Sequence, residues 1–403
     1  MNESIQVASE TLDTETRMAV EFKGKIALLT NFLPPYRIRV LELLNASAQS
    51  LRIFLSVQME CNRKWHADWG ALDVIVQKTI SFKARASRRD PFKETREIHF
   101  PYNTLPQLRS YRPDVIIAAE FGMRTFQAAV YTWLFPETKL IVWATVSMIT
   151  ERNRGNLRKL IRRLILRFTD FVLVNGSSGA AYIESLGYKR ERIRIVPQAT
   201  DNDLFKGPPS RPIDRVCKLL FAGQLIERKG LVQFHEQLVK WCLLHPEREV
   251  SWTLIGSGPM ADIARGWERP ANYALHLIEE VPYRELPTHY RLADIFAFPT
   301  LEDEWGLVVN EAMIAGLPVL GSVYSQAVED LVIDQESGWR FRPDNPAELY
   351  NALDRALNCG AENWNAMRQK AVETVKPIDS AHMKDLILKA VEDACSCSEN
   401  RSA

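Results

Sequence analysis

The stretch Phe298–Gly321 reads FPTLEDEWGLVVNEAMIAGLPVLG. Its apolar start predicts a buried strand that ends at Pro299, and the acidic run at 302–304 predicts a loop. A helix follows from Gly306 or the next residue and ends at Gly316, where a leucine and a proline open a new strand. Strand, loop, helix and strand in this order form the repeating unit of a parallel α/β sheet.

The same alternation continues along the chain in two blocks, which the proline-rich segment KGPPSRPIDR at 206–215 separates. Two such blocks predict an α/β fold with two Rossmann-like domains whose parallel sheets face an interdomain cleft. The predicted divisions are a disordered tail at 1–23, an N-terminal Rossmann-like domain at 24–205, a linker at 206–216, a C-terminal Rossmann-like domain at 217–376, and a helix and tail at 377–403. The final helix, over about Ser380–Ala394, is expected to pack back across the linker onto the N-terminal domain.

Composition excludes several functional classes. The chain has 403 residues with a net charge of +1, so no overall field favours nucleic acid as a partner. The six cysteines lack the spacing of metal ligands, which predicts no metal and fits a reducing cytoplasm. No apolar stretch approaches the ~18–20 residues that cross a bilayer.

The helix that opens after Gly306 is the main candidate for binding chemistry. A helix start presents unpaired N–H groups and a positive dipole end, and a glycine lets an anion approach the backbone. Asp303 and Glu311 bracket this start. In a continuous helix they would be separated by ~12 Å, whereas two carboxylates acting on one glycosidic bond need ~5–10 Å. They are therefore expected to contact different parts of one long ligand.

This stretch resembles the signature of retaining GT-B enzymes of glycosyltransferase family four, the group 1 glycosyl transferases. That signature has two glutamates separated by seven residues. Here Glu311 is the second, and Asp303 replaces the first. The resemblance implies that Glu311 binds the ribose of a nucleotide-diphosphate sugar and that Asp303 reaches the sugar. The implied phosphate-binding backbone belongs to Gly306, Leu307 and Val308.

Three further stretches of the C-terminal half resemble the same family. LLFAGQLIERKG at 219–230 is similar to the loop in which an arginine and a lysine clamp the diphosphate, with Lys229 as the lysine and Gln224 in the arginine's place. LIGSGP at 254–259 matches a glycine turn, and VPYRELPTHYRLAD at 281–294 resembles the segments that flank the base. Lys229 precedes a helix start, where a cation is locally unfavourable unless an anion lies nearby. The implied donor contacts here are Gly223, Gln224, Arg228, Lys229, Gly256, Val281 and Trp305, with Lys229 and Asp303 catalytic.

The N-terminal half resembles the family less closely. NFLPPYR at 31–37 follows the first strand, and Tyr36 and Arg37 are candidates for the donor or acceptor side of the cleft. The stretch WATVSMITE at 143–151 lacks the histidine that many family members carry, so the residue that activates the acceptor is not assigned. Trp305 fits either a core or a pocket wall, and Glu302 and Glu304 are expected to be solvated.

The resemblance implies a retaining hexosyltransferase that needs no cofactor and uses a glycan or lipid-linked acceptor, as in polysaccharide biosynthesis. Two alternatives stay open: a nucleotide-sugar epimerase with the same fold, and a non-catalytic subunit that binds nucleotide sugars. Basic residues gather at 152–167 and at 83–96, the first run alternating with an apolar helical face. This helix either docks on an anionic membrane surface, peripheral to the cytoplasm, or is a solvated helix that flanks a buried strand. Packing of its apolar face on the core is compatible with both.

Overall fold

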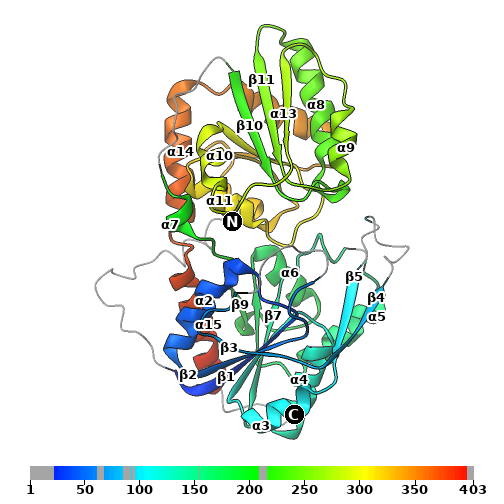
Figure 1. Cartoon of the computed structure of the whole chain (residues 1–403), viewed down its shortest axis with the longest axis vertical. Coiled ribbons are helices and arrows are strands. Elements are labelled where there is room, and N and C mark those ends of the chain that lie inside the picture. The colour runs from blue at the N-terminus through cyan, green and yellow to red at the C-terminus, as the bar shows by residue number, and fades with distance from the viewer. Residues whose placement is uncertain are drawn as a thin grey trace.

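Two parallel sheets, one in each half of the chain, define the architecture (Figure 1). A computed structural model describes residues 22–60, 68–84, 92, 96–152, 154–207 and 216–396. Helices cover both faces of each sheet, and the two domains are stacked along the long axis of the molecule. The hydrophobic side chains of each domain form cores against its own sheet.

The N-terminal sheet has seven parallel strands in the order β3-β2-β1-β6-β7-β8-β9. Its central strand β6 is buried at every position, as expected for a strand covered on both faces. The strands are β1 (Phe22–Thr30), β2 (Ala48–Leu55), β3 (Asp73–Val76), β6 (Val115–Ala119), β7 (Lys139–Ala144), β8 (Phe171–Val174) and β9 (Ile193–Ile195). The helices are α2 (Pro35–Ser47), α3 (Thr104–Tyr111), α4 (Met123–Leu134), α5 (Asn156–Leu166), α6 (Ser177–Ser185), η1 (Arg190–Arg192) and α7 (Asn202–Phe205).

The C-terminal sheet has six parallel strands in the order β12-β11-β10-β13-β14-β15. The strands are β10 (Val216–Ala222), β11 (Glu249–Ile255), β12 (Tyr273–Ile278), β13 (Ile295–Phe298), β14 (Val319–Ser322) and β15 (Gly338–Phe341). The helices are η2 (Glu227–Lys229), α8 (Leu231–Leu244), α9 (Met260–Arg265), α10 (Leu286–Leu292), α11 (Leu307–Ile314), α12 (Gln326–Leu331), α13 (Pro346–Leu357) and α14 (Ala361–Val375).

Each sheet reverses its strand order beside its first strand. In the N-terminal sheet β1 lies between β2 and β6, and in the C-terminal sheet β10 lies between β11 and β13. Open parallel sheets bind ligands beyond the carboxyl ends of the strands at such a reversal, because the loops there diverge to opposite faces. Ligand binding is therefore expected at the loops after β1, β6, β10 and β13.

The last helix, α15 (Ser380–Ser396), belongs to the N-terminal core although it follows the C-terminal domain in the chain. It lies beside α2 in Figure 1, where red and blue ribbons meet. Met383, Ile387 and Val391 are buried with the residues of β1 and β6. The chain thus crosses between the domains twice, which ties them together.

The predicted divisions need two small corrections. Residues 22 and 23, assigned to the tail, belong to β1, because pairing with β2 begins at Phe22. Val216, assigned to the linker, begins β10 and pairs with Glu249. Residues 1–21, 208–215 and 397–403 lie outside the described part of the chain, so most of the predicted linker and both predicted tails are not described.

Several elements were not predicted from the sequence. Helices α3 and α12 are short, and α3 contains a proline, so neither shows a clear helical period. The antiparallel hairpin of β4 (Thr79–Ala84) and β5 (Arg96–Pro101), which lies beside the parallel sheet, was not predicted either. Helices α6 and α14 were also missed.

The helix in the first basic run is α5, and most of its apolar face is exposed instead of packed on the core. Leu157, Leu160, Ile161 and Leu164 are exposed, and only Ile165 and Leu166 of the apolar residues of α5 are buried. The opposite side of the helix faces the protein, where Arg162 forms a buried ion pair with Glu151 at 2.6 Å. A charge pair therefore anchors α5, and its apolar stripe points outward.

Replacing Ile387 with alanine is expected to lower the free energy of unfolding by about 2–5 kcal/mol, because the substitution leaves a cavity in a packed core. Urea denaturation followed by tryptophan fluorescence measures the change. The control is Leu243→Ala, at an exposed position of α8, which should change stability by less than about 0.5 kcal/mol. Equal losses in the two variants would contradict the structural role of α15.

Candidate functional site

Two loops meet at the carboxyl edge of the C-terminal sheet, where its strand order reverses. The loop after β10 contains η2 and ends at Gly230, and the loop after β13 runs from Pro299 to Gly306. The amide of Leu301 donates to the carbonyl of Arg228 at 2.8 Å. Gly230 has φ +66°, and a Cβ there would lie 2.1 Å from the Pro299 carbonyl oxygen. Only glycine permits this approach, so the backbone itself brings the two loops together.

Lys229 and Asp303 form a buried ion pair between these loops. The Lys229 ammonium donates to the Asp303 carboxylate, and both side chains are largely buried. The Arg228 guanidinium lies 3.9 Å from the same carboxylate and donates to the Glu302 carbonyl at 2.9 Å. Burial opposes ionisation of Asp303, but the charges of Lys229 and Arg228 outweigh it and hold its pKa below the usual value. Two cations thus converge on one carboxylate.

Helix α11 begins directly behind this cluster with free backbone amides. Its N-cap is Gly306, at φ +98°, with no capping side chain and no acid in the first turn. The first helical bond runs from the amide of Val309 to the carbonyl of Gly306 at 2.9 Å. In the described part of the chain the amides of Leu307 and Val308 meet no acceptor. These amides and the dipole end can bind an anion.

Gly306 is required by packing as well as by conformation. A Cβ at this position would lie 2.5 Å from the hydroxyl oxygen of Ser325 and 2.9 Å from the ring of Phe298. The Ser325 hydroxyl donates to the carbonyl of Trp305, which fixes the loop against α12. The start of α11 is therefore held from both sides.

Glu311 is a buried carboxylate on α11, 4% exposed. The Tyr290 hydroxyl donates to its Oε2 at 2.9 Å, and Tyr283 also hydrogen-bonds to it. Burial raises the pKa of Glu311 to about 7, although both tyrosine bonds act in the opposite direction. The two tyrosines lie in the segment predicted to flank the base, but nothing in the sequence identified them as partners of Glu311.

The remaining predicted donor residues lie around these loops in different environments. Trp305 is 2% exposed and belongs to the hydrophobic core, where its indole N–H donates to Asn310 at 2.9 Å. Gln224 is exposed, and Val281 is partly exposed. Gly256 closes the turn after β11 against the Gly223 carbonyl, where a Cβ would lie at 1.9 Å.

The expectation that Glu302 is solvated is wrong. Glu302 is buried at the domain boundary and forms an ion pair with Arg154 of the N-terminal domain at 3.2 Å. Its neighbour Glu304 is exposed, as expected. The acidic loop after β13 therefore serves two purposes, one carboxylate contacting the other domain and one facing Lys229.

Contacts across the domain boundary centre on α12. The Gln326 side chain accepts from the Gly179 amide at 2.8 Å and donates to the carbonyls of Val146, at 3.0 Å, and Glu304. Asp330 accepts from the Ser177 amide at 2.8 Å, at the start of α6. Neither Gln326 nor Asp330 could be identified from the sequence, because neither belongs to a recognisable motif.

Tyr36 and Arg37 begin α2 at the carboxyl edge of the N-terminal sheet. The Arg37 guanidinium stacks over the buried ring of Trp143 at 4.5 Å. They come from the loop after β1, so they lie at the strand reversal of their own sheet.

The described residues contain no cluster of acids, histidines and cysteines that could hold a metal ion. No described helix has the length and apolarity to cross a membrane.

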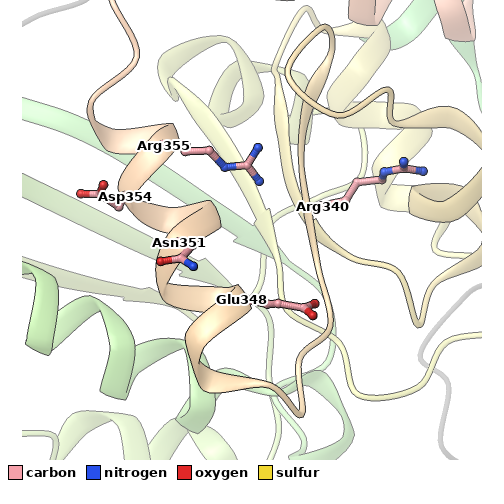
Figure 2. Close-up of a pocket in the computed structure, with 5 residues that line it drawn as sticks. All are labelled: Arg340, Glu348, Asn351, Asp354 and Arg355. Carbon is pink, nitrogen blue, oxygen red and sulfur yellow. The ribbon is translucent and has the colours of Figure 1, made fainter.

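A hollow of about 570 Å³ lies elsewhere, between β15 and α13 (Figure 2). It is lined by Arg340, Glu348, Asn351, Asp354 and Arg355. Its charged groups already have structural partners: Arg355 pairs with Asp334 at 3.0 Å, Glu348 binds Arg342, and Asp354 accepts from Trp241. The hollow is lined by residues of β15 and α13 and by none of the predicted donor residues.

Residues 217–359 match the family model described as "Glycosyl transferases group 1". The chain is 25% identical over 227 residues to a D-inositol 3-phosphate glycosyltransferase of Corynebacterium urealyticum, covering 50% of this chain and 51% of that protein. It is also 25% identical over 225 residues to a protein of Mycobacterium tuberculosis that is named a GDP-mannose-dependent phosphatidylinositol monomannoside mannosyltransferase. That match covers 47% of this chain and 57% of the other protein. The chain thus spans about half the length of these curated relatives.

Solved structures share the fold along nearly their whole length. The lipopolysaccharide outer core galactosyltransferase WaaB superposes with a TM-score of 0.69 at 14% identity, over 91% of this chain and 99% of the other. Anabaena Alr3699/HepE in complex with UDP superposes with a TM-score of 0.68 at 16% identity, over 91% of this chain and 99% of the other. The predicted GT-B fold is confirmed.

Replacing Glu311 with glutamine should change the pH dependence of stability. The folded-state pKa of Glu311, about 7, lies above its ordinary value of 4.5, so its favourable contribution is complete below pH 4.5 and is lost as the pH rises through 7. Glutamine stays neutral and keeps an acceptor for Tyr290. The free energy of unfolding of the variant should therefore exceed that of the native protein by up to about 3 kcal/mol above pH 8 and equal it near pH 4.5.

Thermal unfolding of both proteins between pH 4.5 and pH 8.5 measures this difference. A gap between their melting temperatures that stays constant with pH would contradict the raised pKa of Glu311.

Proposed function

Residues 217–359 belong to the group 1 glycosyl transferases, and from this premise we propose that the whole chain is a retaining glycosyltransferase. It transfers a hexose from a nucleotide-diphosphate donor to a glycan or lipid-linked acceptor, without a metal or other cofactor. The observation that carries the proposal is the open N-terminus of α11 beside two converging cations. Fixed charges and backbone dipoles aimed at a leaving diphosphate are the main source of catalysis expected in such a site.

In this proposal the donor diphosphate competes with Asp303 for Lys229. A diphosphate carries more charge than one carboxylate, and the amides of α11 add further donors on its other side. Asp303, released from Lys229, then accepts hydrogen bonds from hydroxyls of the donor sugar. Arg228 supplies the second cation in place of the arginine that Gln224 replaces, since its guanidinium already lies beside Asp303.

Glu311 binds the ribose hydroxyls in the same proposal. Tyr283 hydrogen-bonds to Glu311 and is partly open to solvent, so it is the side chain that an entering nucleoside would displace. Tyr290 is buried and keeps its bond to Oε2, which holds the carboxylate in position. The base would then lie against the segment that begins at Val281.

The names of related proteins support the substrate classes. One relative is named for GDP-mannose, and one structural neighbour binds UDP, so both point to nucleotide-diphosphate donors. Two relatives are named for inositol phosphates or phosphatidylinositol glycosides. For this chain we propose that the N-terminal domain, including Tyr36 and Arg37, binds the acceptor and that the reaction occurs in the cytoplasm.

Replacing Lys229 with alanine is expected to lower kcat by about 10²–10³, because the site loses a charge that neutralises the leaving diphosphate. A thermal-shift screen of UDP-, GDP- and ADP-sugars first identifies the donor through its stabilisation of the folded protein. Turnover is then measured with the preferred donor and an acceptor. Lys389→Ala, on the surface of α15, is the control and should keep native turnover.

Unchanged turnover in Lys229→Ala would exclude the leaving-group role. A product isomerised in the sugar without any acceptor would instead identify an epimerase. Donor binding without turnover on any acceptor would favour the non-catalytic subunit.

The outward stripe of α5 supports docking on an anionic membrane surface. Leu157 and Leu160 are 72% and 61% exposed and share one helical face with Ile161 and Leu164. Cationic side chains flank this stripe on both sides, among them Arg158, Lys159 and Arg163. An apolar stripe edged by cations suits the boundary between lipid headgroups and acyl chains. Of the second basic run, Arg85, Arg88, Arg89 and Lys93 lie outside the described residues.

Replacing Leu157 and Leu160 together with serine should weaken binding to vesicles that contain phosphatidylglycerol by at least about tenfold, because two exposed side chains no longer enter the lipid. Vesicle sedimentation measures the effect. The matched control is the pair Leu243→Ser and Leu244→Ser on α8, whose side chains are 64% and 62% exposed. Native affinity in the α5 variant, or equal loss in the control, would contradict docking through α5.

A further inference from the structure

Helix α12 of the C-terminal domain caps helix α6 of the N-terminal domain. Among the described residues, α6 has no side chain of its own that caps its start at Gly176, and its first turn contains no acid. The first amides of any helix lack acceptors in its own backbone. Here the Ser177 amide donates to Asp330 at 2.8 Å, and the Gly179 amide donates to Gln326 at 2.8 Å. One domain therefore completes a helix of the other.

Two glycines of the N-terminal domain allow this close approach. A Cβ at Gly176 would lie 2.3 Å from a carboxylate oxygen of Asp330 and 3.1 Å from the amide oxygen of Gln326. A Cβ at Gly179 would lie 3.1 Å from the same Gln326 oxygen and 2.7 Å from the Val146 carbonyl oxygen. Larger residues at these positions would force α12 and α6 apart, so the contact depends on the sequence of both domains.

Gln326 connects three segments through one side chain. The residue is 1% exposed, and its amide oxygen accepts from Gly179. Its amide nitrogen donates to the carbonyl of Val146, after β7, at 3.0 Å and to the carbonyl of Glu304 in the acidic loop. A glutamine amide has two N–H donors, so one is used in each domain. We call this set of three hydrogen bonds the Gln326 junction.

The Glu304 carbonyl belongs to the loop that holds Asp303. The Asp303 amide donates to the carbonyl of Tyr324 at 3.2 Å, and the Trp305 amide donates to the Asp303 carboxylate at 3.2 Å. Both of these bonds lie within the C-terminal domain. The bond from Gln326 to Glu304 differs because the same amide is also bonded to the N-terminal domain. The junction around Asp303 is therefore complete only while the two domains are in contact.

We propose that Gln326 is a positioning residue for sugar transfer. It holds the acidic loop so that Asp303 can accept hydrogen bonds from the donor sugar, and it does so only while the N-terminal domain contacts α12. The inference rests on the proposed function, since that function places Asp303 at the sugar. An uncharged amide suits the junction because its partners are one N–H and two carbonyl groups. A carboxylate of the same shape would face both carbonyls without a donor.

The junction should affect the chemical step more than nucleotide binding. Within the described chain, the hydrogen bonds of the Gln326 side chain reach neither Glu311 nor the start of α11, the proposed contacts of the nucleotide. Loss of the junction leaves those contacts in place. It frees the loop that orients the sugar, and small errors in the orientation of reacting groups lower the rate of reaction strongly.

The test compares Gln326→Met and Gln326→Glu with Asp330→Asn. Methionine keeps the length of the side chain without its hydrogen bonds, and glutamate keeps only the acceptor for Gly179. Asp330→Asn is the matched control, because it lies on α12 and keeps an acceptor for Ser177, and the hydrogen bonds of Asp330 in the described chain do not reach the acidic loop. Turnover is measured with the preferred donor and an acceptor, and nucleotide affinity by calorimetry.

Both Gln326 variants should lower kcat by about tenfold or more, with Gln326→Glu the more affected, and should change nucleotide affinity by less than about threefold. Asp330→Asn should stay within about threefold of the native protein in both measurements. Unchanged kcat in the Gln326 variants would overturn the proposal. So would equal losses in Asp330→Asn, or a parallel loss of nucleotide affinity, since either result would indicate general loosening of the domains.

Gly179→Ala breaks the same junction from the N-terminal domain. Its new methyl group would crowd the Gln326 amide oxygen and the Val146 carbonyl. The variant should also lower kcat while nucleotide affinity is kept. Combined with Gln326→Met it should cause no further loss, because both substitutions remove one junction. Additive losses in the double variant would show two independent effects and contradict the link between the domains.

Hydrogen exchange without substrates separates this inference from the proposed function. In the peptide that covers residues 301–306, exchange should be faster in Gln326→Met than in Asp330→Asn, whether or not the protein transfers sugar. Equal exchange in the two variants would overturn the inference. Faster exchange in Gln326→Met, together with a native protein that binds no nucleotide, would refute the proposed function and leave the link between the acidic loop and the N-terminal domain in place.

Discussion

The ion pair of Lys229 and Asp303 is the interaction on which the C-terminal site depends. It joins the loops after β10 and β13 at the point where Gly230 already brings their backbones together. Breaking such a pair leaves a charge buried without a partner, which costs more than the pair itself contributes. Lys229 is therefore held in place by Asp303, and in the proposed function a diphosphate takes the place of Asp303 without leaving either cation unpaired.

The same loops also connect the two domains. Two neighbours of Asp303 make these contacts. The Glu302 side chain pairs with Arg154, and the Glu304 carbonyl accepts a hydrogen bond from Gln326. Any movement of Asp303 on donor binding would be transmitted to residues that touch the N-terminal domain. The crossing of α15 onto the N-terminal core limits how far the domains can separate. A change of a few contacts around α12 is therefore the motion this architecture most readily allows.

Much of the fold could be predicted because buried parallel strands read as short apolar runs between helical patterns. Helices of six to eight residues, such as α3 and α12, carry too few turns to show a period. The motif around Gly306 indicated the start of α11 correctly, since a glycine N-cap has local sequence signals. Tyr290, Gln326 and the pairing of Lys229 with Asp303 depend on tertiary contacts. No spacing along the chain encodes them.

The two domains repeat one arrangement. In each sheet the first strand lies at the reversal, and the strand on its far side leads into a helix with a glycine N-cap: β6 into α4 after Gly122, and β13 into α11 after Gly306. Neither helix has an acid in its first turn or a capping side chain, although such caps are the usual way to satisfy free amides. A cation lies near each helix start, Arg124 on one and Lys229 beside the other. Arg124 donates to neutral acceptors close to the carboxylates of Glu60 and Glu120, so only the start of α11 combines free amides with two cations that meet on one carboxylate. The repeated arrangement therefore supports anion binding at α11, where the helix dipole and the two cations act in the same direction.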